Sequence, residues 1–196
     1  MLEILDTIGV PSTVSIPTFT TSSTGQGSFA SGGDYSIPLD AVPATYVSAL
    51  TNRASTGIGG ALLPTSLFAS GHCGQYGLTD PRSITGIHNG LRLSVHVAAA
   101  SPSDLVTYQV VGGALALFTL QETVHESPIG AGHYIIWSHG STNWWDLLPI
   151  GHFTSVQSTI DQELAVFVPS TSTGGTPRVL DQNGGVVAVS GMRLAG

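Results

Sequence analysis

The alternation of apolar and polar positions is clearest in residues 91–97, which read Leu-Arg-Leu-Ser-Val-His-Val. The leucines and valines point to one side and the polar residues to the other, as in a strand that is buried on one face. A Ser-Pro-Ser-Asp turn follows, and residues 105–111 are predicted to return as the next strand. Apolar runs bounded by Gly, Pro, Asn or Asp predict further strands over residues 114–120, 134–138, 164–168 and 186–194.

Helical periodicity is confined to the first third of the chain. Residues 43–53 are the best helix candidate, because Pro43 suits the first turn of a helix and the apolar side chains that follow fall near one face. A further turn of helix is predicted at residues 64–69. Near the other end of the chain, Asn183 and Gly184 separate two apolar pairs, a pattern that predicts a tight hairpin.

Seven to nine short strands at these spacings predict an all-β fold. The expected architecture is a two-sheet antiparallel β-sandwich of jelly-roll type with one or two short helices. We find no internal repeat and no interdomain linker, so residues 1–196 are expected to form a single β-sandwich domain. Residues 1–40, which are rich in Ser, Thr, Gly and Pro, are expected to be either an extended arm or an integral part of the sandwich.

The chain carries unusually few charges. Its five basic residues are all arginines, and only 9% of its residues are charged while 41% are hydrophobic. A folded chain of this mass exposes about 8,700 Å², which leaves about one charge per 500 Å² where an average composition gives about one per 180 Å². A surface so poor in charge permits association, so we expect much of it to be buried against other subunits. The absence of lysine itself has a second explanation, genome base composition, and both explanations stay open.

The charge balance also disfavours two classes of partner. Binding to phosphate needs clustered basic side chains, whereas the arginines are scattered singly in a chain of net charge −7. We therefore expect no direct contact with nucleic acid, and none with an anionic membrane surface.

The histidines suggest a metal site. Pro128-x-Gly130-x-x-His133 resembles a fragment of the second cupin motif, which supplies one metal ligand on a small jelly-roll barrel. The first cupin motif, with its two close histidines and a glutamate, is absent, and a centre of this kind needs three or four convergent groups. No metal or other cofactor is therefore expected, and His125, His133 and His139 are the candidate ligands to test.

Two further groups of residues have candidate functions. Trp137, Trp144 and Trp145 are candidate binding or interface residues, because exposed tryptophans stack on sugar rings in lectins and anchor subunit contacts. Asp161 and Glu163 are expected to share one face of a strand, and a pair of carboxylates is the catalytic set of most glycosidases. Paired acids near the start of a strand are more often solvated.

Many short strands, long Ser/Thr/Gly loops, few charges and no complete catalytic set resemble the shell or protrusion protein of a non-enveloped virus or phage. In particular, residues 91–97, 105–111 and 179–194 resemble paired strands of a capsid jelly roll. The resemblance implies a non-enzymatic virion protein at the capsid surface, which assembles with copies of itself or with other capsid subunits. The chain lacks the basic arm of many small-virus coat proteins, which points to a protruding domain, a decoration subunit or a shell without contact to the genome.

Two alternative functions remain open. One is a lectin-like or receptor-binding β-sandwich, whose partner would be a host receptor or a glycan. The other is a cupin-like metal-dependent enzyme.

Overall fold

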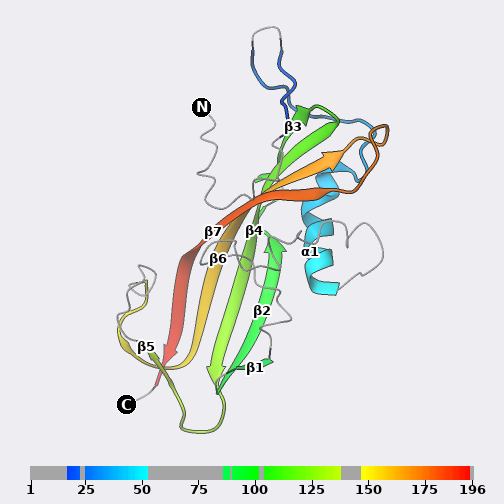
Figure 1. Ribbon diagram of the computed structural model, residues 1–196. Helices are drawn as coiled ribbons and strands as arrows, with labels where there is room; N and C mark the ends of the chain where they lie inside the picture. Colours follow the sequence, from blue (N-terminus) through cyan, green and yellow to red (C-terminus); the bar gives the residue numbers. More distant parts are fainter. Residues whose placement is uncertain are drawn as a thin grey trace.

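The computed structural model combines a short helical segment with a seven-stranded antiparallel sheet (Figure 1). The structure describes residues 17–22, 25–52, 86–88, 90–101, 104–137 and 147–194. The helical elements are η1 (Leu39–Ala41) and α1 (Val42–Asn52). The strands are β1 (Gly86–His88), β2 (Leu91–Ala99), β3 (Val106–Val110), β4 (Gly113–Pro128), β5 (Ile135–Trp137), β6 (Gly151–Pro169) and β7 (Arg178–Arg193). No helix among the described residues is long and apolar enough to cross a membrane.

Three long strands form the centre and one side of the sheet. β4, β6 and β7 have 16, 19 and 16 residues, and β6 pairs with β4 along one edge and with β7 along the other. β2 and β3 pair with the two halves of the remaining edge of β4, and β1 pairs with β2. β5 pairs with the first residues of β6, beyond the end of β4. The result is an elongated antiparallel sheet (Figure 1).

Helix α1 packs on one face of this sheet, which we call the inner face; the opposite face is the outer face. Val42 and Tyr46 are fully buried, and the Tyr46 ring meets Phe118 of β4 edge-on at 6.2 Å between ring centroids. Helix α1 contacts β2 and β4, so it covers this part of the sheet, and Phe118 in turn lies beside Leu164 of β6. The helix predicted at residues 43–53 is thereby confirmed, with Pro43 in its first turn as expected.

The described residues before η1 extend the sheet along β3. Phe19 and Phe29 form antiparallel bridges with Val110 and Tyr108, and a short hairpin between them projects from the end of the sheet (Figure 1). The Phe19 ring contacts the Tyr108 ring edge-on, with 5.9 Å between ring centroids, and the Phe29 ring stacks on Tyr108 at 5.3 Å. The chain then reaches the end of β6, where Tyr35 bridges to Ser170.

The hairpin predicted at Asn183 and Gly184 is wrong, because β7 runs straight through these residues. Gly184 lies opposite Gln162 of β6. A Cβ on Gly184 would collide with the Gln162 side-chain amide and would lie 2.8 Å from the Asp161 carbonyl oxygen. The glycine is therefore required for close packing against a fully buried glutamine within a strand, and it does not form a turn.

The all-β class is confirmed, since strands dominate the described residues and α1 is short. These residues form one open sheet, and no second sheet appears among them. Segments 114–120 and 164–168 are strands as predicted, but each is only part of a much longer strand. The further helical turn predicted at residues 64–69 lies outside the described residues.

Candidate interaction surface

The inner face carries two apolar clusters. The first lies under α1 and includes Phe118, Leu120 and Leu164. The second lies at the other end of the sheet and consists of Trp137, Leu148, Phe153 and Val156, with Ile135 and Val189 packed against it. Each cluster contains side chains from neighbouring strands, so the two clusters pack together the opposite ends of the same long strands.

A polar band separates the clusters. Glu122, Ser158 and Gln162 are 2%, 8% and 0% exposed. Glu122 lies between Val97 of β2 and Ile160 of β6, and burial raises its pKa from an ordinary 4.5 to about 7. A carboxyl group in these surroundings is most stable in its neutral form, because water cannot solvate its charge. Glu122 therefore makes the stability of the sheet depend on pH between 4.5 and about 7.

Several of the exposed apolar side chains gather at one end of the outer face. Ile135 and Trp137 point into the second inner cluster, so Ile136 between them points outward. Ile136 pairs with His152, and the Tyr134 ring stacks on His152 at 4.3 Å between centroids. On the far side of His152, the Leu194 backbone N–H donates to the His152 carbonyl oxygen.

Met192 completes this group. A Cβ on the preceding Gly191 would meet the Phe153 ring, and the following Arg193 lies over that ring at 5.8 Å, both on the inner face. Met192 between them therefore points outward. We call the group on the outer face the end patch; its members are Tyr134, Ile136, His152, Met192 and Leu194.

The end patch is exposed and carries no acidic or permanently basic side chain. Ile136 and Met192 are 62% and 68% exposed, and Tyr134 and Leu194 are 42% exposed each. The first acidic residue along β6 from His152 is Asp161, nine residues away, which corresponds to about 30 Å along a strand. Contiguous apolar patches of several hundred Å² on a soluble protein commonly mark contact sites.

The edge of β7 is a second candidate contact. Among the described residues β7 pairs with β6 alone, so its other edge has no described partner. Residues 182–192 contain no charged residue and no proline. Bulges interrupt the pairing of β7 with β6 and leave two regular stretches, residues 181–186 and 188–192. Exposed edges without charge or proline are templates for pairing with another chain.

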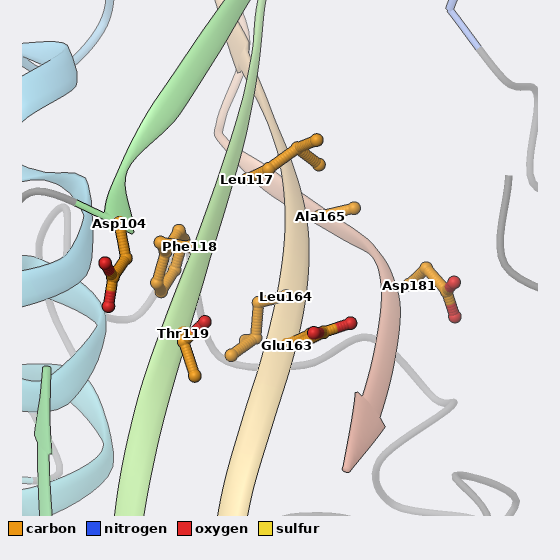
Figure 2. A pocket seen from close by; sticks show the side chains of 8 residues that line it. All are labelled: Asp104, Leu117, Phe118, Thr119, Glu163, Leu164, Ala165 and Asp181. Atoms are coloured by element: carbon orange, nitrogen blue, oxygen red, sulfur yellow. The ribbon is translucent and has the colours of Figure 1, made fainter. Parts of the chain in front are cut away.

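The outer face also has a shallow hollow of about 260 Å³ (Figure 2). Figure 2 shows Asp104 and Asp181 on opposite sides of it, with Thr119 and Glu163 between them and Leu117 and Ala165 on the two central strands nearby. Its described lining contains three carboxyl groups and no basic side chain.

The expectation that Asp161 and Glu163 share a face is confirmed, and that face is the outer one. The Gln121 side-chain amide donates a hydrogen bond of 3.1 Å to the Asp161 carboxylate. Glu163 instead lines the hollow. Both side chains belong to the solvated outer surface of the central strands.

The two candidate metal ligands that the structure describes, His125 and His133, lie in different elements. His125 is on the outer face of β4, between Ser94 of β2 and Gln157 of β6. His133 is exposed in the connection between β4 and β5, and His139 lies outside the described residues. In the part of the chain that the structure describes, no group of three or more His, Cys, Asp or Glu side chains is placed to hold a metal ion.

Of the three candidate tryptophans, the structure describes Trp137 alone. Its side chain is 4% exposed and packs in the second inner cluster, beside Leu148 and Phe153. Trp144 and Trp145 lie outside the described residues. The end patch was missed from sequence because Ile135-Ile136-Trp137 is an unbroken apolar run, in which alternation does not reveal which side chain points outward.

Comparison with known proteins identifies no relative. No protein-family model, no curated protein and no solved structure matches this chain.

Proposed function

We propose that this chain is a self-assembling structural subunit, a shell, protrusion or decoration protein of a non-enveloped virus or phage. The observation that carries the proposal is the uncharged edge of β7, over residues 182–192, which lacks a partner among the described residues. An open strand edge pairs with a strand of another chain through main-chain hydrogen bonds, with little demand on side-chain identity.

The rest of the surface supports the same function. Seventeen charged residues in 196 leave large areas without the repulsion that keeps soluble proteins apart. Assembly with further copies, or with other capsid subunits, would cover these areas. Nucleic acid is not among the proposed partners, because the chain has net charge −7.

The jelly-roll sandwich is retained as part of this proposal. The inner face has α1 and two apolar clusters, but the outer face of the described sheet has no layer packed on it among the described residues. A second sheet on that face would turn the observed layer into a sandwich.

Light scattering after size-exclusion chromatography, with negative-stain imaging of the same fractions, tests the proposal. At tens of micromolar we expect masses that are multiples of the 20.1 kDa subunit, and regular particles or oligomers in the images. A strictly monomeric protein at that concentration would overturn the proposal.

A pair of lysine variants tests the role of the edge. Ser190 on β7 and Gln157 on β6 are cross-strand partners on the outer face, and both are exposed. We expect Ser190→Lys, combined with Val187→Lys on the same strand, to weaken assembly because charges on an edge strand oppose pairing. Gln157→Lys adds charge to an interior strand and should leave assembly nearly unchanged. Equal effects of the β7 and β6 variants would contradict an edge contact.

A further inference from the structure

We infer that the end patch binds the end patch of a second copy of this chain, outer face against outer face about a two-fold axis. The inference rests on the proposed self-assembly and names one of its contacts. The contact differs from one along the β7 edge, because it uses the face of the sheet and includes β5, which lies on the opposite side of β6 from β7; the two share Met192.

The shape of the patch favours a sheet as its partner. Ile136, His152 and Leu194 lie side by side on three neighbouring segments, which makes one row across the sheet. Tyr134 and Met192 flank this row on the same face. A flat row of this kind suits face-to-face packing, in which side chains of two sheets interdigitate across about 10 Å. Two copies related by a two-fold axis place the same patch on both sides, as the commonest oligomers do.

The area of the patch is sufficient for a weak specific dimer. Its four apolar side chains and Ile150, which directly precedes β6 and is 55% exposed, together expose about 500 Å² at about 200 Å² for each large side chain. Two copies in contact remove about 1,000 Å² from water, which is near the lower limit for a biological interface. A contact of this size acts together with others in an assembly.

Electrostatics also favours a second copy as the partner. The chain has net charge −7, so two copies repel each other unless their acidic residues stay apart. The patch contains no acid, and Asp161 is the first acid along β6 on the outer face. Arg193 at this end lies over the Phe153 ring on the inner face. A contact made by the members of the end patch therefore brings no two carboxylates together, and Arg92, which is exposed on the outer face at this end, adds positive and not negative charge beside it.

The test uses Ile136→Glu in the full chain, with Val111→Glu as the matched control. Both residues are exposed, 62% and 68%, and both variants add one negative charge, but Val111 lies in the turn between β3 and β4 at the other end of the sheet. To isolate the patch contact, both are made in the Val187→Lys background, whose lysine lies five residues before Met192 along β7, and masses are measured by sedimentation velocity over a concentration series. Melting temperatures and near-ultraviolet circular dichroism confirm that each variant is folded.

We expect the lysine background to form dimers of twice 20.1 kDa, Ile136→Glu to raise the dimer dissociation constant at least about tenfold, and Val111→Glu to leave it unchanged. If Ile136→Glu does not fold, Ile136→Ser, which adds no charge, is expected to weaken the dimer in the same direction. A dimer that survives Ile136→Glu overturns the end-patch contact, and so does a variant that melts earlier while its mass stays unchanged. Since the wild-type chain would still assemble in those cases, the proposed function would stand; a wild-type monomer would overturn both.

Discussion

Replacing Glu122 by glutamine should stabilise the protein above neutral pH and change little at acid pH. Glu122 is 2% exposed, on the inner face between Val97 and Ile160, and burial raises its pKa from 4.5 to about 7. Glutamine has nearly the shape of the protonated glutamate and no charge, so it reproduces the form that the buried site prefers.

The sign and size of the effect follow from linkage. Between pH 4.5 and 7 the folded protein holds a proton on Glu122 that the unfolded chain has lost, so the free energy of unfolding falls as pH rises through this interval. Below pH 4.5 Glu122 is protonated in both the folded and the unfolded state, and above pH 7 the loss of stability is complete. A shift from 4.5 to about 7 corresponds to about 3 kcal/mol, or about 6 to 12 °C in melting temperature for a domain of this size.

Thermal unfolding of wild type and Glu122→Gln at pH 4 and pH 8 measures the difference. Burial also raises the pKa of Glu126, against a smaller lowering by His125, but this contribution is present in both proteins and cancels in the comparison. Glu163→Gln, a change at an exposed residue of β6, serves as the control and should change the free energy of unfolding by less than about 0.5 kcal/mol at either pH. If the melting temperatures of the wild type and Glu122→Gln differ by the same amount at pH 4 and at pH 8, the reasoning is refuted.

Two further predictions concern packing. Gly184→Ala should lower the free energy of unfolding by about 1 to 3 kcal/mol, because the new methyl group collides with Gln162. Gly185→Ala is the control, since its methyl group would enter open space and should have little effect. Equal losses of stability in chemical denaturation would count against the packing role of Gly184. Trp137→Ala should lower the free energy of unfolding by about 3 to 5 kcal/mol in the same assay, because it removes the largest side chain of the second inner cluster. A loss of free energy below about 1 kcal/mol would show that this cluster contributes little to stability.

The sequence contained enough information for the elements whose side chains alternate regularly. Residues 91–97 alternate without interruption, and β2 follows them with two residues added. The helix after Pro43 was also recognisable. By contrast, β4 and β6 were cut short because Glu122, Ser158 and Gln162 place polar groups at inner-face positions. The pattern of alternating apolar residues predicts the end of a strand at a buried polar residue, although the strand continues beyond it.

Tertiary contacts decided the features that sequence could not reveal. Asn183-Gly184 has the signature of a hairpin, but Gly184 is needed where β7 passes the buried side chain of Gln162. Likewise, Ile135 and Ile136 are equivalent in sequence, and only the pairing with β6 places one in the inner cluster and the other in the end patch. The low charge density, in contrast, was visible from composition alone.

The central claim is that this charge-poor open sheet associates with further copies of itself. Sedimentation velocity of the wild-type chain, from about one to several tens of micromolar, tests it most directly. We predict a sedimentation coefficient that rises with concentration, from the 20.1 kDa subunit to larger species. A single species at the subunit mass across the whole range would contradict the claim.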